Sequence, residues 1–248
     1  MSWSSNIPDS LVTLVRHGQA SYLEGDHYDR LSAVGERQSA LLGAYWADRG
    51  ITFDAVFSGP AERHRRTAAM VAEVMRRRSI QWPDARVIDT FDEFPGEDIV
   101  RKLGPLLAER HAHVRDLSAA FEIAPSHEVR KQALDRLFHE VAGRWVDAEA
   151  AAPGVETWAA FVARVATALG SVADETPPGG RAVVFTSAGP IAVAVSRALD
   201  LTARKTLGLA FSSRNASWTE LRVRQGQFEL RSFNSFPHLD APELLTYR

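Results

Sequence analysis

A short apolar run at residues 11–15 ends in Arg16, His17 and Gly18, and this ending constrains the fold more than any other feature. Open α/β sheets place their chemistry at the carboxyl ends of their strands. A histidine at such a point, with an arginine before it and a flexible glycine after it, can present one ring nitrogen to an anionic substrate. His17 is therefore a candidate nucleophile toward phosphorus. The alternative is that Arg16 and His17 are ordinary polar residues that cap a strand.

Similar apolar runs alternate with helical patterns along the chain. Strands are predicted at residues 55–57, 86–88 and 182–186, and helices at residues 33–49, 61–78 and 158–173. This alternation predicts a three-layer α/β/α sandwich with a mostly parallel central sheet. Residues 217–231 predict a hairpin that turns at Gln225-Gly226 and adds strands near a sheet edge.

The stretch at about residues 95–153 is mostly helical, rich in charge and too long for a plain crossover. We interpret it as a helical cap inserted into a single domain that spans residues 1–248. A chain of 248 residues, 45% of them hydrophobic, can bury a core of that size.

Composition excludes several classes of function. The 29 basic and 31 acidic residues are well mixed, so the chain lacks the basic face that nucleic-acid binding needs. The absence of cysteine excludes disulfides, thiolate catalysis and thiolate metal sites. Residues 1–10 lack a secretory pattern, and no run of about 18 uncharged apolar residues occurs. We expect a soluble, cytoplasmic protein with no nucleic-acid or membrane partner.

A second basic motif follows the apolar run at residues 55–57. Residues 58–68 read Ser-Gly-Pro-Ala-Glu-Arg-His-Arg-Arg-Thr-Ala and open a helical stretch, so Arg63 also lies just past a strand. Planar guanidinium groups meet phosphate oxygens with paired hydrogen bonds. Arg16 and Arg63 are therefore candidate phosphate ligands, with surface salt bridging as the alternative role.

The two motifs resemble the signatures of the histidine phosphatase superfamily, the phosphoglycerate-mutase-like proteins, which are Arg-His-Gly and Ser-x-Pro-x-x-Arg-x-x-x-Thr-Ala. Three further segments match in order, namely Asp92-Glu93-Phe94 with Gly96, Gly154-Val155-Glu156-Thr157 with Phe161 and Arg164, and Asn215-Ala216-Ser217 with Glu220-Leu221. The resemblance spans nearly the whole chain. It implies a phosphoglycerate-mutase-like fold in which the inserted cap overhangs the site and selects the substrate.

The resemblance also implies a phosphatase mechanism. His17 would take the phosphoryl group as a neutral imidazole, Arg16 and Arg63 would hold it, and Glu93 would protonate the leaving oxygen. Water would then hydrolyse the phosphohistidine. The implied ligand is a phosphorylated small molecule or inorganic phosphate, and no cofactor is implied.

The resemblance implies Glu93 as the general acid because this residue falls on the family's acid position. Its aromatic neighbours can desolvate the carboxyl group, and bound phosphate adds like charge. Both effects raise the pKa of a carboxyl group and keep it protonated. Local chemistry alone leaves Asp92, Glu97 and Asp98 as alternatives, and a solvated acidic loop is the structural alternative.

Ser187 departs from the family pattern. The family carries a second histidine after a late strand, in a His-Gly-Gly segment, whereas here residues 183–186 run into Ser187. Losing a hydrogen bond to a charged group costs about 1.5–3 kcal/mol, or roughly one to two powers of ten in phosphate affinity. The implied function is a phosphatase of reduced activity in which Ser187 still contacts phosphate. The alternative is a non-catalytic phosphoryl-ligand-binding or scaffolding protein.

A phosphoglycerate-type mutase is less favoured. The mutases of the family follow Arg-His-Gly with Glu-Ser and then Trp-Asn, whereas residues 19–22 here read Gln-Ala-Ser-Tyr. Gln19 and Ser21 are candidate hydrogen-bond donors to phosphate, with helix or loop capping as the alternative. His27 and Tyr28 are candidates for the rim of the pocket.

The remaining histidines point to no metal site. His64 is expected to be structural, because neighbouring residues on a helix point about 100° apart and Arg63 occupies the functional direction. His111 and His113 lack the spacing of three or four residues that places two ligands on one helical face. We therefore expect no metal.

Overall fold

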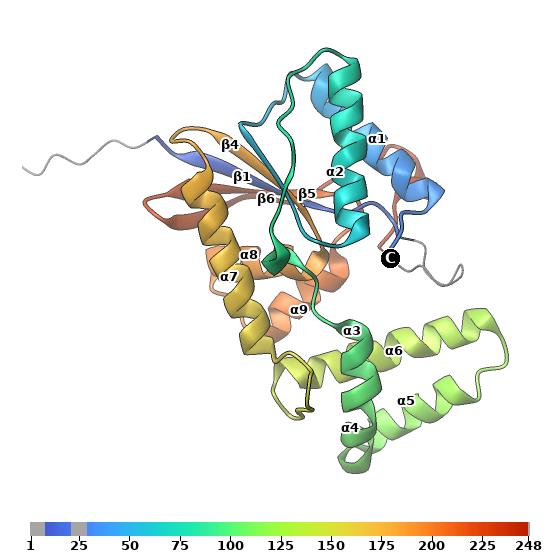
Figure 1. The fold of residues 1–248 in the computed structure, drawn as a ribbon. Helices are drawn as coiled ribbons and strands as arrows, with labels where there is room; N and C mark the ends of the chain where they lie inside the picture. The colour runs from blue at the N-terminus through green and yellow to red at the C-terminus, as the bar shows by residue number, and fades with distance from the viewer. Residues whose placement is uncertain (1–7, 21–28, 248) are drawn as a thin grey trace, which may run out of the picture.

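A six-stranded mixed sheet forms the centre of the computed structural model, which describes residues 8–20 and 29–247 (Figure 1). The strands are β1 (Ser10–Arg16), β2 (Ala55–Ser58), β3 (Arg86–Val87), β4 (Arg181–Thr186), β5 (Trp218–Arg224) and β6 (Gln227–Ser235). They lie in the order β3-β2-β4-β1-β5-β6. The first four of this order pair in parallel, and β5 runs antiparallel to β1 and to β6. The sheet is therefore mostly parallel, as the sequence predicts.

Helices cover both faces of the sheet (Figure 1). One face carries α1 (Ala33–Asp48) and α2 (Glu62–Arg77), and the other carries α7 (Trp158–Glu175), α8 (Ala188–Leu199) and α9 (Ala203–Ser212). The result is the predicted three-layer sandwich. The predicted helices at 33–49, 61–78 and 158–173 agree with α1, α2 and α7 within two residues at each end.

The sheet has a hydrophobic core on each of its two faces because successive side chains along a strand point to opposite sides. Leu14 of β1 and its partner Val184 of β4 belong to the core shared with α7 and α8. Their neighbours Val15 and Phe185 point to the opposite face and pack with α1 and α2. The two central strands are buried on both sides, which explains their nearly continuous apolar sequence.

The predicted hairpin is confirmed at the sheet edge. Gln225 and Gly226 both have positive φ angles, of 50° and 75°, and join β5 to β6. Two consecutive residues with positive φ are typical of the type I′ turn, whose twist matches that of the flanking strands.

A helical segment lies between β3 and α7 in the sequence and to one side of the sheet in space (Figure 1). It contains α3 (Gly96–Asp98), the π-helix η2 (Ile99–Leu103), α4 (Gly104–Arg110), α5 (Ala112–Glu122) and α6 (His127–Val146). Its buried side chains join the same core as α7 and α8. The role of this segment as a substrate-selecting cap stays a prediction. Within residues 8–20 and 29–247, no helix is both long and apolar enough to cross a membrane.

Candidate active site

The candidate residues come together at the carboxyl edge of the sheet. Arg16 is the last residue of β1, so His17 emerges directly from that strand. Ser187 follows β4, the parallel neighbour of β1, and is the N-cap residue of α8. Arg63 lies in the first turn of α2, and Glu93 lies between the 3₁₀ turn η1 (Asp89–Phe91) and α3. Parallel strands and the helices that follow them thus converge on one place.

The imidazole of His17 has a fixed tautomer. Its Nδ1 atom lies 2.7 Å from the carbonyl oxygen of Gly18, which can only accept a hydrogen bond, so Nδ1 carries the proton. Its Nε2 atom is then left with a lone pair. The main chain holds the residue from both sides, since the His17 amide donates to the Thr186 carbonyl at 2.9 Å and its carbonyl accepts from the Asn215 side-chain amide at 3.2 Å.

Burial keeps this imidazole neutral. His17 is 6% exposed, and its desolvation holds its pKa well below the usual value. The nearby charges of Arg63 and Arg16 lower the pKa of His17 further, against a raising effect from the hydrogen bond to Gly18. A neutral imidazole with a free lone pair is the nucleophilic form of histidine.

Gly18 lets the chain pass tightly between two helices. Its amide donates to the Thr67 hydroxyl of α2 at 3.1 Å. A Cβ at this position would lie 2.4 Å from the Gly35 carbonyl oxygen of α1, which is closer than real Cβ atoms come to other atoms. The backbone that follows His17 can therefore reach this position only without a side chain.

The two arginines are buried and held in place. Arg16 donates through Nη1 to the carbonyl oxygen of Ser213. Arg63 donates through Nη1 to the Asp29 carboxylate at 2.7 Å and through Nη2 to the Ser187 hydroxyl at 3.4 Å. Asp29 also accepts from the Glu62 amide at 2.7 Å, so it caps α2 and orients Arg63 at once. Two fixed guanidinium groups create a positive site beside His17.

Glu93 has a carboxyl group suited to proton donation. One oxygen accepts from the Phe94 amide and the other from the Gly189 amide, each at 3.0 Å. Burial raises the pKa of Glu93, although the two amides, Arg63 and Arg16 oppose the shift. The carboxyl group therefore holds its proton to a higher pH than an exposed glutamate does.

The alternative acids have different surroundings. Asp92 accepts a hydrogen bond from the Glu93 amide at 2.9 Å. Hydrogen bonds from Arg101 and then Lys102 lower the pKa of Asp98 and favour its ionised form. Glu97 is exposed. These contacts favour Glu93 as the proton donor.

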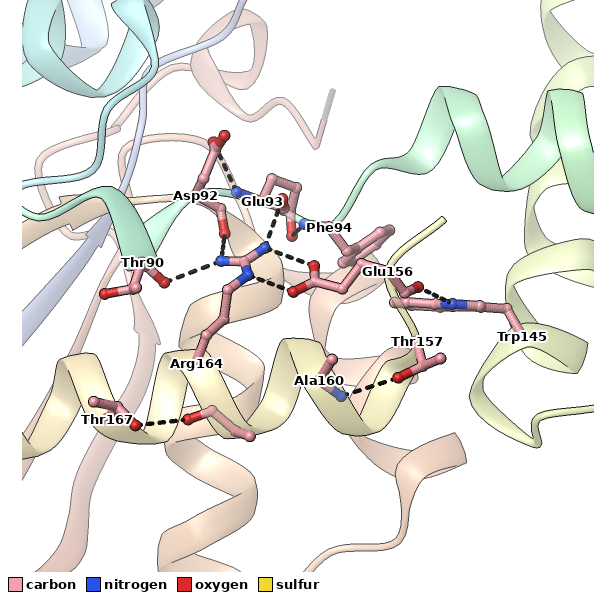
Figure 2. Close-up of polar contacts among 11 residues, drawn as sticks. Thr90, Asp92, Glu93, Phe94, Trp145, Glu156, Thr157, Ala160, Arg164 and Thr167 are labelled. Carbon is pink, nitrogen blue, oxygen red and sulfur yellow. Dashed lines mark hydrogen bonds and ion pairs between the residues drawn. The ribbon is translucent and has the colours of Figure 1, made fainter. Parts of the chain in front are cut away.

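Figure 2 shows how Arg164 of α7 holds the loop that carries Glu93. Its Nη1 donates to the carbonyl oxygens of Thr90 and Asp92 at 3.0 and 2.8 Å, and its Nη2 donates to that of Glu93 at 3.1 Å. The Glu156 carboxylate accepts from Arg164 Nε and Nη2 at 2.7 and 3.0 Å. Three main-chain contacts and one bidentate ion pair thus fix the position of this loop.

A cleft of about 490 Å³ opens beside these groups. Its lining includes Arg63 and Glu93, together with Asp29, Pro60, Ala61, Asp92, Phe94, Pro95, Gly96, Glu97 and Asp98. One wall of the cleft therefore comes from the start of α2. The other comes from α3 and from the loop of residues 90–95 that carries Glu93, which we call the acid loop. This arrangement leaves room for a ligand beside Arg63 and Glu93.

Gln19 takes part in helix capping. Its side-chain oxygen accepts from the Ser32 hydroxyl at 2.8 Å, and Ser32 caps α1 by accepting from the Gly35 amide at 3.1 Å. This contact supports the capping alternative, and the proposed contact of Gln19 with phosphate stays a prediction. Ser21, His27 and Tyr28 lie outside the described residues.

His64 lies in the site, where sequence reasoning did not place it. Its ring centroid is 5.6 Å from that of His17, and its Nε2 atom is 2.6 Å from the Ser187 hydroxyl oxygen. An offset of about 100° per residue separates side chains along a helix, but the end of α2 abuts the site and presents both Arg63 and His64 to it. The direct adjacency of His64 to Arg63 is the sequence signal that could have indicated this position.

Elsewhere in the chain, His111 contacts an arginine and a carboxylate. His111 lies 2.8 Å from Arg144 and 3.1 Å from Glu149. In the part of the chain that the structure describes, no group of three or more histidines, cysteines or carboxylates is arranged to hold a metal ion.

Fold and site define an α/β protein with a neutral histidine and two arginines at the carboxyl edge of its sheet. The sequence model of the histidine phosphatase superfamily (branch 1) matches residues 12–92 and 125–235. The chain therefore belongs to this superfamily.

Individual relatives show what the chain is similar to. A broad-specificity phosphatase of Saccharomyces cerevisiae is 33% identical over 72 residues, which cover 27% of this chain and 31% of that protein. The match thus spans about a third of the relative's length.

Solved structures share the fold. Phosphoglycerate mutase of Bacillus anthracis has a TM-score of 0.62 at 16% identity, with coverage of 93% of this chain and 95% of that one. A mutant phosphoserine phosphatase of Entamoeba histolytica, in complex with phosphoserine, has a TM-score of 0.60 at 18% identity, with coverage of 93% and 99%. A mycobacterial glucosyl-3-phosphoglycerate phosphatase has a TM-score of 0.59 at 22% identity, with coverage of 92% and 99%.

Proposed function

We propose that the protein hydrolyses a phosphomonoester through a phosphohistidine intermediate on His17. The observation that carries this proposal is the state of the His17 ring, which is buried and neutral and has its Nδ1 proton bound to Gly18. Its Nε2 lone pair is the nucleophile. Two buried arginines beside it supply the positive charge that a phosphoryl group needs.

The reaction proceeds in two steps. In the first, His17 Nε2 attacks phosphorus, the P–O ester bond breaks, and the Glu93 proton passes to the leaving oxygen. In the second, water attacks phosphorus, its proton passes to the Glu93 carboxylate, and the N–P bond breaks to release inorganic phosphate. Arg16 and Arg63 neutralise the phosphoryl oxygens in both steps.

The substrate class follows from the site and from the relatives. The cleft accommodates a small leaving group beside Arg63 and Glu93. The yeast relative is a broad-specificity phosphatase, and a structure of similar fold is a complex with phosphoserine. We therefore propose a phosphorylated small molecule as substrate.

Ser187 favours a second candidate, a protein that binds phosphoryl ligands without turnover. In this proposal Ser187 occupies the position of the family's second histidine, and its short hydroxyl makes the site a weaker catalyst.

Trapping of the intermediate distinguishes the two functions. We expect the protein to become labelled when it is mixed with a ³²P-labelled phosphomonoester and quenched with base, and the label to be lost in acid, because a phosphoramidate is acid-labile. Peptide mass spectrometry should place the phosphoryl group on His17. A protein that binds inorganic phosphate yet neither labels nor turns over is a binding protein, and a label on another residue would refute His17 as the nucleophile.

Arg164 is predicted to act as a positioning residue for the general acid. Arg164→Lys keeps the charge but cannot bind Glu156 and three carbonyl oxygens at once, so Glu93 should shift. A displacement of about 1 Å can cost up to about 10²-fold in rate. We expect kcat to fall by about 10- to 100-fold with an alkyl phosphate and much less with p-nitrophenyl phosphate, whose leaving group needs no proton.

A matched control is Arg204→Lys, because Arg204 forms an ion pair with Asp147 away from the acid loop. This variant should retain the parent kcat with both substrates. Equal losses of kcat with the two esters in Arg164→Lys would show that Arg164 supports the fold and not the acid.

A further inference from the structure

A second buried histidine has no role in the mechanism above. His64 is fully buried in the first turn of α2, and its ring lies beside that of His17. Its Nε2 atom is 2.6 Å from the hydroxyl oxygen of Ser187, which is itself 1% exposed. The two side chains form one buried polar pair at the phosphoryl site.

The sequence makes room for this imidazole. A Cβ on Gly59 would lie 2.4 Å from His64 Nδ1 and 3.1 Å from Cε1, so only glycine at position 59 allows the ring its place. On the other side, the small side chain of Ser187 leaves the space that the ring edge fills. His64, Gly59 and Ser187 are thus sterically matched.

The direction of the hydrogen bond follows from the other ring nitrogen. Among residues 8–20 and 29–247, His64 Nδ1 has no hydrogen-bond partner. A buried N–H without an acceptor is rarer than a buried acceptor that lacks a donor. The proton of the neutral ring therefore lies on Nε2, which donates to the Ser187 oxygen.

The Ser187 oxygen receives a second hydrogen bond from Arg63 Nη2, at 3.4 Å. A hydroxyl group has two acceptor positions and one donor hydrogen. With both acceptor positions filled by N–H groups, the hydroxyl can act only as a donor. No further partner of this oxygen occurs in the described part of the chain, so its hydrogen is available to a ligand.

We propose that His64 orients the Ser187 hydroxyl as a dedicated hydrogen-bond donor to the transferring phosphoryl group. This inference rests on the proposed function, because it assumes that the phosphoryl group binds between His17 and Arg63. Ser187 is the binding residue, and His64 is a positioning residue that acts through it. The pair thereby supplies the donor that a histidine at position 187 would supply alone.

The charge state of His64 is consistent with this role. Burial, and then the charge of Arg63, hold the pKa of His64 well below its usual value. Burial thus favours a neutral His64, which keeps one N–H for donation to the Ser187 oxygen.

A double-mutant cycle tests the coupling. We expect Ser187→Ala and His64→Leu each to lower kcat/KM for p-nitrophenyl phosphate by about 10- to 100-fold, the value of a hydrogen bond to a charged group. Because the histidine acts through the serine, the double variant should lose no more than either single variant. Losses that multiply in the double variant would refute the proposal, and so would a folded Ser187→Ala protein with the parent kcat/KM.

Conservative replacement separates orientation from packing. His64→Gln retains an N–H donor at a similar reach and should recover most of the activity that His64→Leu loses. If His64→Gln is folded and as inactive as His64→Leu, hydrogen-bond donation from residue 64 does not support activity, and the proposal is refuted. Circular dichroism and thermal unfolding of each variant show whether the fold is retained.

Two control variants remove similar groups elsewhere. His238 is a buried histidine stacked on Trp218, and Ser10 is a buried serine at the opposite end of β1. His238→Leu and Ser10→Ala should keep kcat/KM within about twofold of the parent, whatever their stability. A loss of kcat/KM in these controls as large as in the site variants would assign the effects to general destabilisation. It would refute the proposed role of His64 and Ser187.

Titration with inorganic phosphate keeps this inference separate from the proposed function. If the parent shows no turnover, the proposed function fails. The pair still predicts that the affinity for inorganic phosphate falls by about 10- to 100-fold in Ser187→Ala and His64→Leu. Unchanged phosphate affinity and unchanged turnover in both variants would refute the proposed role of His64 and Ser187. The proposed phosphatase function would still stand.

Discussion

Replacing His17 by alanine should lower kcat for p-nitrophenyl phosphate by about 10³-fold or more, because removal of a nucleophile closes the covalent route altogether. Acid-labile labelling should disappear with it. Arg16 and Arg63 remain in place, so the affinity for inorganic phosphate, measured by calorimetry, should change little. The loss would therefore lie in the chemical step and not in binding.

An exposed histidine provides the control for this variant. His113 lies on α5, and His113→Ala should retain the parent kcat. A folded His17→Ala protein that hydrolyses the ester as fast as the parent would show that the nucleophile is wrongly assigned.

The Glu93→Gln variant should lose about 10²–10⁴-fold in kcat on an alkyl phosphomonoester, the usual contribution of general acid–base catalysis. An alkoxide is a poor leaving group and needs a proton in the transition state, whereas p-nitrophenolate leaves without one. The loss on p-nitrophenyl phosphate should therefore be much smaller. Rates with the two esters, measured side by side, give the comparison.

The pH dependence provides a second check on Glu93. Burial raises the pKa of Glu93, so the protonated acid persists to a higher pH than in an exposed carboxyl group. The rate with an alkyl ester should fall as the pH rises through this pKa, and Glu93→Gln should lack that descending limb. Equal losses on both esters would give Glu93 a structural role and move the search for the acid to Asp92 and Glu97.

Much of the fold is predictable because its elements have local signals. The β1 and β4 sequences are short apolar runs, and Ser32 and Thr157 mark the starts of α1 and α7 as capping residues. The helix α8 is harder to recognise, and its N-cap residue Ser187 makes no side-chain capping hydrogen bond. Its residues 188–195 are apolar or small and all buried, so they lack the alternation of polar and apolar faces that reveals a surface helix.

The residues of the candidate site also differ in whether the sequence carries a local signal for them. His17, Arg16 and Arg63 follow from the rule that chemistry lies at strand ends, together with the matching motifs. The contact between His64 and Ser187 joins residues 123 positions apart and depends on how the end of α2 packs against β4. Helical periodicity gives the direction of a side chain around its own axis, but not the surface that the helix end meets.

The Arg164 contacts have a consequence for how this protein can diverge. The guanidinium group binds the carbonyl oxygens of the acid loop and none of that loop's side chains. Every amino acid offers the same carbonyl, so mutations at cleft-lining positions such as Pro95 and Glu97 leave this anchor intact. The side chains that line the cleft can therefore vary in evolution while Arg164 still holds the main chain of Glu93, the proposed proton donor.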